Sequence, residues 1–177
     1  MELQGISYRF GRDINTDYIM GSRHRAKTLD WNDLARHIME DIRPGFYDEI
    51  KSGGFIVADE NFGCGSSREY APLVIKLAGI SAVLAKSFAR IFYRNSVNLG
   101  LPVLTCDTTA IKEGDYIKVA PDFSSVENIT RGVVIRVTPP PGFMMKIIRE
   151  GGMVQCLKKY GPGVFEQLAK EQNNNSI

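Results

Sequence analysis

The stretch Asn61-Phe62-Gly63-Cys64-Gly65-Ser66-Ser67-Arg68-Glu69 decides how this chain is expected to fold. It follows Phe55 to Ala58, a short apolar segment with the β-branched composition of a buried strand. After it, apolar residues recur at helical spacing up to Gly79, namely Tyr70, Leu73, Val74, Leu77 and Ala78. The stretch is therefore predicted to be a glycine loop between a strand and a helix, with Arg68 in the first helical turn.

This loop is predicted to bind an anion. A helix that follows a glycine loop leaves several backbone N–H groups unpaired at the positive end of its dipole. The forked guanidinium of Arg68 suits a carboxylate, and the hydroxyls of Ser66 and Ser67 lie within reach of a bound group. On the pattern alone, such a loop is more often a tight turn without function. Whether it binds an anion therefore has to be judged from the residue types in it.

The loop does not match the common glycine-rich fingerprints. Arg68 stands where a dinucleotide fingerprint has its third glycine, and no Gly-Lys-Ser/Thr sequence marks a nucleotide P-loop. Ser66 is followed by Ser67-Arg68, which does not make a nucleophile elbow. A serine hydrolase would have to recruit His24 from a loop, because His37 lies in a predicted amphipathic helix, where we expect a surface role.

Ser66 fits proton abstraction from carbon better than hydrolysis. A serine hydroxyl is a poor base unless its alkoxide is stabilised, which backbone N–H groups, the helix dipole and Arg68 could all do. An anionic substrate held by Arg68 would place its own acidic C–H beside that oxygen. The site then lacks an electrophile for the departing group. The chain shows no metal-ligand pattern, so we expect no metal here and an electrophile from another chain.

Length and composition are those of an ordinary soluble globular protein. The chain has 177 residues, is 44% hydrophobic and 24% charged, and carries a formal net charge of +2. This gives no argument for nucleic acid or a membrane, since no apolar stretch approaches ~20 residues. The first residues have no basic and apolar regions of the signal-peptide kind, so we expect no signal peptide. Cys64, Cys106 and Cys156 are expected to be free thiols in the cytoplasm, with Cys64 a small buried side chain.

The chain is predicted to form one α/β domain over residues 1–177, with a frayed tail at about 172–177. Residues 55–104 alternate strand, helix, strand, helix and strand, which is typical of a parallel sheet. Short antiparallel strands are expected afterwards at 116–119, 126–129 and 133–137, and short helices at 144–149 and 154–160. The result is a mixed parallel and antiparallel sheet with flanking helices.

The N-terminal part is predicted to combine a strand, loops and one amphipathic helix. We expect a strand at 2–10, a polar loop at 11–17, a short buried strand at 18–20 and an exposed basic loop at 21–28. Asp30 then caps a helix that Pro44-Gly45 ends, with one more turn at 46–50. Its apolar face comprises Trp31, Leu34, Ala35, Ile38 and Ile42.

Two polar groups have ordinary explanations on pattern alone. Asn15-Thr16-Asp17 consists of turn-forming residues, and a turn is the expected structure there. Arg90, Arg94 and Asn95 lie in the helix expected after Phe88, where such residues are typical of a surface or an interface.

Longer motifs make the chain resemble a known family. The segment from Asn61 to Pro72 resembles the hallmark of the small subunits of 3-isopropylmalate dehydratase and related aconitase-type hydro-lyases. Asn15-Thr16-Asp17-Tyr18-Ile19 is similar to an early Asp-Thr-Asp segment of that family, and Lys86 to Asn95 matches a third block. Further matches are Gly100-Leu101-Pro102, Phe143-Met144-Met145 and Gly151-Gly152, so the resemblance covers nearly the whole chain.

The resemblance implies the swivelling β/β/α domain that corresponds to the last domain of aconitase, in a heteromeric enzyme. A large subunit would carry a 4Fe–4S cluster acting as Lewis acid on the hydroxyl of a small dicarboxylate substrate. Ser66 would be the base, Ser67 and Arg68 would bind the substrate carboxylate, and Asp17 would aid proton transfer to the departing hydroxyl. The reaction would be the isomerisation of 2-isopropylmalate to 3-isopropylmalate by dehydration and rehydration, in leucine biosynthesis. The isolated chain could also self-associate.

The loop after Met20 departs from the family pattern. The family often has Pro-Ala-Arg-Tyr-Leu there, in the loop that contacts the variable group of the substrate. Arg23 matches the family arginine and is a candidate substrate-binding residue, whereas His24, Arg25 and Lys27 form the candidate specificity segment. Because an isopropyl group prefers apolar neighbours and a carboxylate prefers a cation, 2,3-dimethylmalate, methylmalate-type diacids and homoaconitate stay open as substrates. An anion-binding module without catalysis also stays open.

Overall fold

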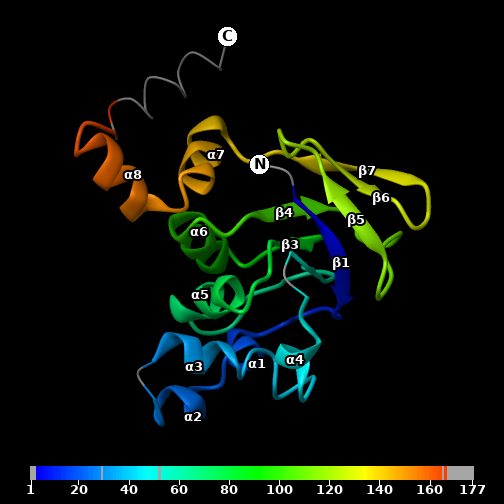
Figure 1. The fold of residues 1–177 in the computed structure, drawn as a ribbon, viewed down its shortest axis with the longest axis horizontal. Coiled ribbons are helices and arrows are strands. Elements are labelled where there is room, and N and C mark those ends of the chain that lie inside the picture. The colour runs from blue at the N-terminus through cyan, green and yellow to red at the C-terminus, as the bar shows by residue number, and fades with distance from the viewer. Residues whose placement is uncertain (1–2, 29, 52, 165, 167–177) are drawn as a thin grey trace.

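Seven strands close into a barrel in the order β1-β2-β3-β4-β7-β6-β5 (Figure 1). The computed structural model describes residues 3–28, 30–51, 53–164 and 166, and these strands lie within them. β1 (Leu3–Arg9), β2 (Phe55–Val57), β3 (Ala82–Ala85) and β4 (Val103–Cys106) run parallel to one another. β5 (Tyr116–Val119), β6 (Ser125–Asn128) and β7 (Val133–Thr138) pair antiparallel, and the β1–β5 pair closes the barrel.

The parallel half confirms the predicted alternation of strands and helices. α5 (Tyr70–Leu77) connects β2 to β3, and α6 (Arg90–Leu99) connects β3 to β4. In the register, Ile56 lies opposite Val83, and Leu84 lies opposite Leu104. Every residue of β2 and β3 is buried, as is typical of parallel strands that are covered on both faces. In Figure 1, α5 and α6 lie together on one side of these strands.

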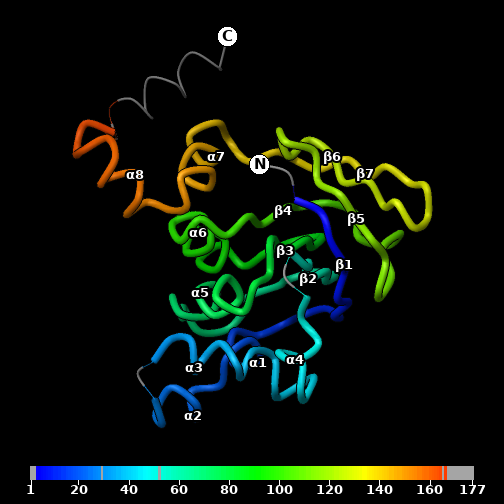
Figure 2. The backbone as a smooth tube through the Cα atoms, viewed as in Figure 1, coloured from blue at the N-terminus to red at the C-terminus, as the bar shows by residue number. Residues whose placement is uncertain are grey.

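The antiparallel half and the C-terminal helices also confirm the prediction. β5, β6 and β7 occupy the expected positions to within a residue or two, and α7 (Gly142–Arg149) and α8 (Met153–Tyr160) follow them. Both helices pack against α6, and Figure 2 shows them on the same side of the barrel as α6. The sheet is mixed, as predicted, but its closure into a barrel was not predicted. Hydrophobic periodicity gives the faces of a strand and not which two edges meet.

Two N-terminal predictions were wrong. Residues 18–20, expected to form a buried strand, belong largely to the helical turn α1 (Thr16–Ile19), and Tyr18 is 46% exposed. Residues 21–28, expected to be an exposed loop, contain the helical turn α2 (Ser22–Arg25), in which His24 is only 6% exposed. An apolar run of three residues cannot distinguish a strand from a helix, and a basic composition does not reveal that one side chain is buried.

The next helix confirms its predicted start and falls short of its predicted length. Asp30 caps α3 (Trp31–Ala35) by accepting hydrogen bonds from the N–H groups of Asn32 and Asp33. Beyond Ala35 the chain continues as a series of turns, and α4 (Phe46–Glu49) makes the further turn expected after Pro44-Gly45. Leu34, Ala35 and Ile38 are buried as predicted, whereas Trp31 and Ile42, and Leu77 in α5, are exposed.

Some predictions concern parts of the chain that the structure does not address. The tail at 172–177 lies outside the described residues, and a single domain over 1–177 stays a prediction. Within the described ranges, the helices are too short or too polar to cross a membrane.

Three motif-bearing segments leave the barrel at the same edge. Because β1, β2 and β3 are parallel, their carboxyl ends meet there, which is where open parallel sheets commonly bind ligands. Phe62 anchors the segment after β2: it is fully buried and packs edge-on against Phe92 of α6, with ring centroids 5.3 Å apart. Gly63 follows with φ +78°, and a Cβ placed on it would lie 2.2 Å from the Phe92 ring. A side chain at position 63 would therefore strain the left-handed backbone and clash with Phe92, so this position requires glycine.

We expect Gly63→Ala to lower the free energy of unfolding by at least about 2 kcal/mol, because backbone strain adds to a clash with Phe92. Gly114 is a matched control, with φ +77° and no atom within 4 Å of an added Cβ. Gly114→Ala should cost only the backbone term of about 1 kcal/mol. Urea denaturation measures both, and equal losses would contradict the packing argument.

Candidate active site

Backbone hydrogen bonds join the glycine loop to the segment before α1. The N–H of Gly63 donates to the carbonyl of Ile14 over 2.7 Å, and the N–H of Thr16 donates to the carbonyl of Cys64 over 2.8 Å. The two segments therefore run side by side as a short parallel bridge. The Asn15-Thr16-Asp17 turn and the glycine loop form one unit.

Thr16 and Gly65 fix the position of Ser66 within this unit. The hydroxyl of Thr16, which is almost fully buried, donates to the carbonyl of Ser66 over 2.9 Å. Gly65 has φ +88°, and a Cβ placed on it would lie 2.4 Å from Oδ1 of Asn15. A side chain at position 65 would therefore push the two segments apart.

The third motif is attached to the same loop. The N–H of Phe62 donates to the carbonyl of Ser87 over 3.0 Å, and the N–H of Ala89 donates to the carbonyl of Phe62 over 2.9 Å. The hydroxyl of Ser87 also accepts from the N–H of Asn61 over 2.8 Å. Three segments that are far apart in the sequence thus meet through backbone contacts.

Asp17 and Arg68 form an ion pair across this junction. Nη1 of Arg68 contacts Oδ1 of Asp17 and donates to the carbonyl of Met20 over 3.1 Å. The guanidinium also lies 5.9 Å from the centre of the Tyr70 ring. Among the residues that the structure describes, Nε and Nη2 of Arg68 have no acceptor, so two parallel donors remain for a ligand.

Arg68 does not lie in the first turn of α5, contrary to the prediction. The helix begins at Tyr70 with Glu69 as its N-cap, and Arg68 belongs to the loop, where its N–H donates to the carbonyl of Ser66 over 2.8 Å. Helical spacing of apolar residues locates a helix better than its first residue. The contribution of the helix dipole at Ser66 is therefore weaker than expected, because the dipole acts mainly within the terminal turn.

Unpaired backbone donors surround Ser66. Within the described part of the chain, the N–H groups of Gly65, Ser66 and Ser67 donate to no protein acceptor. All three residues are exposed, so these donors face solvent or a ligand. Successive free N–H groups in such a turn can bind an anion, and anion binding by this loop stays a prediction.

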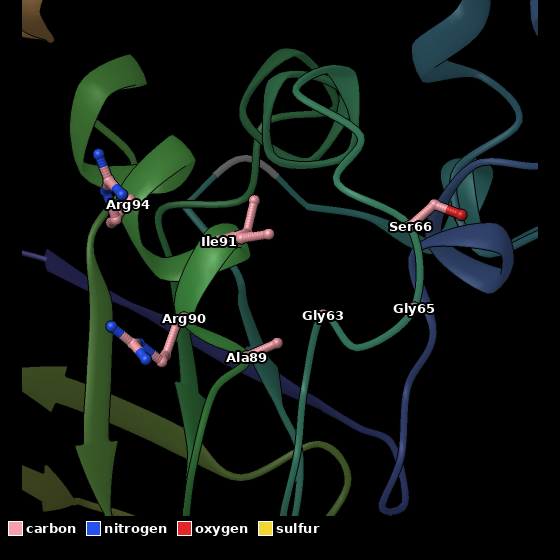
Figure 3. A pocket seen from close by; sticks show the side chains of 7 residues that line it. All are labelled: Gly63, Gly65, Ser66, Ala89, Arg90, Ile91 and Arg94. Atoms are coloured by element: carbon pink, nitrogen blue, oxygen red, sulfur yellow. The ribbon is translucent and has the colours of Figure 1, made fainter.

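A hollow of about 380 Å³ lies beside the loop, on the side of α6 (Figure 3). Its walls come from the glycine loop and the first turns of α6. In Figure 3, the Ser66 hydroxyl points away from Ala89 and Ile91, and Arg90 and Arg94 lie on the far side of the hollow. Ser66 is thus one of the residues that line the hollow, although its hydroxyl does not point at the α6 wall.

The candidate specificity segment makes contacts of its own. Arg23 forms an ion pair with Asp41 and donates from Nε to Nε2 of His24 over 3.1 Å. Arg25 lies over the Trp31 ring at 4.8 Å and donates to the carbonyl of Thr28 over 3.0 Å. Lys27 is exposed. The structure brings together Ser66, Ser67, Arg68 and Asp17, whereas Arg23, His24 and Arg25 contact residues outside that group.

Cys64 is half-buried and fits the predicted role of a packing side chain better than that of a nucleophile. Burial, and then the nearby carboxylate of Asp13, raise the pKa of the Cys64 thiol. A raised pKa keeps sulfur in its less reactive protonated form.

Sequence reasoning missed two groups of residues. Thr16 was treated only as part of a turn, although a buried hydroxyl between two turn formers needs a hydrogen-bond partner. His37 was expected at the surface, but its ring stacks on His24 with centroids 4.2 Å apart. The sequence carries no signal for that contact, since the two residues belong to separate turns.

Comparisons with known proteins identify the family of the chain. A family model described as the aconitase C-terminal domain matches residues 27–109. The 3-isopropylmalate dehydratase small subunit 2 of Archaeoglobus fulgidus is 51% identical over 161 residues, covering 91% of this chain and 98% of that protein. The chain belongs to the 3-isopropylmalate dehydratase small-subunit family.

Other members of the 3-isopropylmalate dehydratase small-subunit family support the assignment. The small subunit of Wolinella succinogenes is 49% identical over 164 residues, covering 92% of this chain and 98% of that protein. The crystal structure of 3-isopropylmalate dehydratase from Methanocaldococcus jannaschii has a TM-score of 0.86 and 40% identity, covering 98% of this chain and 99% of that one. The predicted family and the predicted aconitase-type fold are both confirmed.

We expect Thr16→Val to lower the free energy of unfolding by about 1 kcal/mol, the usual net value of one hydrogen bond. Loss of the bond to the Ser66 carbonyl should also speed amide hydrogen exchange in residues 64–68. Thr16→Ser keeps the hydroxyl and should retain exchange close to that of the unaltered chain. If Thr16→Val leaves exchange in this loop unchanged, Thr16 does not hold Ser66.

Proposed function

We propose that this chain is the small subunit of a 3-isopropylmalate dehydratase, a hydro-lyase that isomerises 2-isopropylmalate to 3-isopropylmalate in leucine biosynthesis. The observation that carries the proposal is the row of unpaired N–H groups at residues 65–67, beside the Ser66 hydroxyl and the open fork of Arg68. This arrangement suits a carboxylate next to an acidic C–H. The relatives that carry the dehydratase name match the chain over nearly their whole length.

Ser66 removes the proton from the substrate carbon in this proposal. Ser66 is exposed and precedes the Asp17-paired Arg68 by two residues, so a diacid held by Arg68 would lie beside its hydroxyl. Fixed N–H donors and a guanidinium lower the free energy of the alkoxide without any reorganisation of the loop. The bond from Thr16 to the Ser66 carbonyl keeps those donors in place.

Arg68 binds one substrate carboxylate through Nε and Nη2, because Nη1 is already held by Asp17 and the Met20 carbonyl. Ser67, adjacent and exposed, adds a hydroxyl and an N–H to the same carboxylate. Asp17 retains an accessible carboxylate and aids proton transfer to the departing hydroxyl. Arg23 would have to leave Asp41 to reach the substrate, and its exposed side chain allows such a movement.

The missing electrophile comes from a large subunit. Iron–sulfur clusters are held by cysteine thiolates, and the group of possible metal ligands found among the described residues contains only His24, His37 and Glu40. A 4Fe–4S cluster on the large subunit would supply a Lewis acid for the substrate hydroxyl. The hollow beside α6, with Arg90 and Arg94 exposed at its rim, is available for that subunit to pack against.

The identity of the diacid depends on the segment from Arg23 to Lys27. The Arg25 guanidinium lies over the Trp31 ring, and Arg23 forms an ion pair with Asp41. Fewer free cations are therefore available to the substrate than the sequence suggested. This favours the apolar isopropyl group over the second carboxylate of homoaconitate. Archaeoglobus fulgidus has two proteins of this name, 51% and 45% identical to the chain, so a related substrate such as 2,3-dimethylmalate has to be tested directly. We place the reaction in the cytoplasm, where the free thiols would stay reduced.

Reconstitution with the cognate large subunit tests the proposal. We expect no turnover by the chain alone, and turnover of 2-isopropylmalate above that of 2,3-dimethylmalate and homoaconitate in the complex. Turnover by the isolated chain would contradict a shared active site. Binding of diacids by the chain with no activity in any complex would favour an anion-binding module.

We expect Ser66→Ala in that complex to lower kcat by about 10²- to 10⁴-fold with little change in KM, because it removes only the base. Ser67→Ala is the neighbouring comparison and should raise KM instead, since it removes a substrate contact. Both variants should assemble with the large subunit as the unaltered chain does. A Ser66→Ala complex with undiminished kcat would show that the base is another residue.

A further inference from the structure

Three side chains from two separate turns converge on one point outside the candidate active site. Oε2 of Glu40 lies 2.6 Å from Nδ1 of His37 and 3.4 Å from Nε2 of His24. One ligand atom from each residue lies within 4.8 Å of the other two. His37 and Glu40 have no role in the reaction proposed above, and His24 belongs to the segment from Arg23 to Lys27.

Local backbone geometry explains the convergence. Beyond α3, the N–H of Glu40 donates to the carbonyl of His37, as part of consecutive turns with bonds between residues three apart. In such turns the side chains at i and i+3 lie above one another, which places His37 and Glu40 on one side. α2 brings the His24 ring onto the His37 ring, with an angle of 22° between their planes.

The hydrogen bond from Arg23 fixes which nitrogen of His24 carries a lone pair. Nε of Arg23 donates to Nε2 of His24 over 3.1 Å. A guanidinium has donors only, so Nε2 must carry the lone pair and Nδ1 the proton. Nδ1 of His24 is buried and has no partner in the described part of the chain. In this neutral form of the ring, Nε2 of His24 is the atom that could bind a metal ion.

We propose that His24, His37 and Glu40 form a binding site for a divalent transition metal ion of the zinc type. Two imidazoles and one carboxylate are a ligand set that zinc accepts, with water or a further group in the fourth position. Ligands about 2.0–2.1 Å from a tetrahedral zinc ion lie about 3.3–3.4 Å from each other. The two nitrogens lie 2.6 and 3.4 Å from the Glu40 oxygen, and all three atoms lie within 4.8 Å of one another. Rotations of the two stacked rings would bring the atoms to that spacing and direct both lone pairs at one ion. The Glu40 oxygen now fills the place between the two nitrogens, and its half-exposed side chain can withdraw to admit the ion.

Arg23 competes with such an ion for Nε2 of His24. It contacts the nitrogen that His24 would offer to the metal, and it is tied to Asp41, whose negative charge lies beside the cluster with that of Glu40. The Arg23 side chain is 62% exposed, so its displacement loses little packing. An occupied site would release Arg23 from His24 and fasten the specificity segment to the turn at residues 37–41. The metal site itself does not depend on the dehydratase proposal.

Titration of the tag-free chain with ZnCl₂, followed by calorimetry, tests the site. We expect one ion per chain, with binding weakened at least about 10- to 100-fold in His37→Gln and Glu40→Gln. Glu127→Gln, an exposed carboxylate on β6, is the matched control and should bind like the unaltered chain. Arg23→Gln should bind zinc more tightly, because it removes the competing cation. Co²⁺ should give the visible absorption of tetrahedral coordination.

Three results would overturn the proposal. The first is no saturable zinc binding by the chain. The second is binding that His37→Gln leaves unchanged and that alkylation of the thiols removes, which would place the ion on cysteine. The third is weaker binding in Arg23→Gln. Thermal unfolding of each variant, measured by circular dichroism, ensures that only folded proteins are compared.

Discussion

The structure depends on a few backbone hydrogen bonds at one edge of the barrel. Gly63 bonds to Ile14, Thr16 bonds to Cys64, and Ala89 bonds to Phe62, so the segments leaving β1, β2 and β3 hold one another in place. Backbone bonds of this kind require close approach, and glycine at position 65 permits it. Each segment alone would be a mobile loop, and the three together form a rigid frame for Ser66.

The frame explains why the candidate site is only half of an active site. It presents backbone N–H donors and an exposed serine next to the Asp17–Arg68 pair, yet the group is open to solvent. Electrostatic stabilisation by fixed dipoles is strongest where water is excluded. In the proposed function, the partner supplies the missing electrophile. Because the partner would also cover the site and exclude water, it would strengthen the interactions that this chain provides.

Much of the fold could be predicted from the sequence because its signals are local. Periodicity located β2, β3, β4 and both crossover helices, and turn chemistry located the cap at Asp30. Barrel closure, the burial of His24 and the stacking of His24 on His37 depend on contacts between distant segments, which no local pattern contains. Residue types and family resemblance predicted that Ser66, Arg68 and Asp17 belong together, as they do in the structure, whereas their roles in a reaction stay predictions. The role of Thr16 required knowledge of which carbonyl lies beside its hydroxyl.

A crystal structure of this chain with its large subunit and a bound diacid would show directly whether Arg68 and Ser66 act on the substrate. We expect a substrate carboxylate on Nε and Nη2 of Arg68 and on the N–H groups at residues 65–67, with Oγ of Ser66 against the carbon that loses its proton. A diacid bound without contact to Arg68, or with Ser66 turned away from it, would rule out these roles.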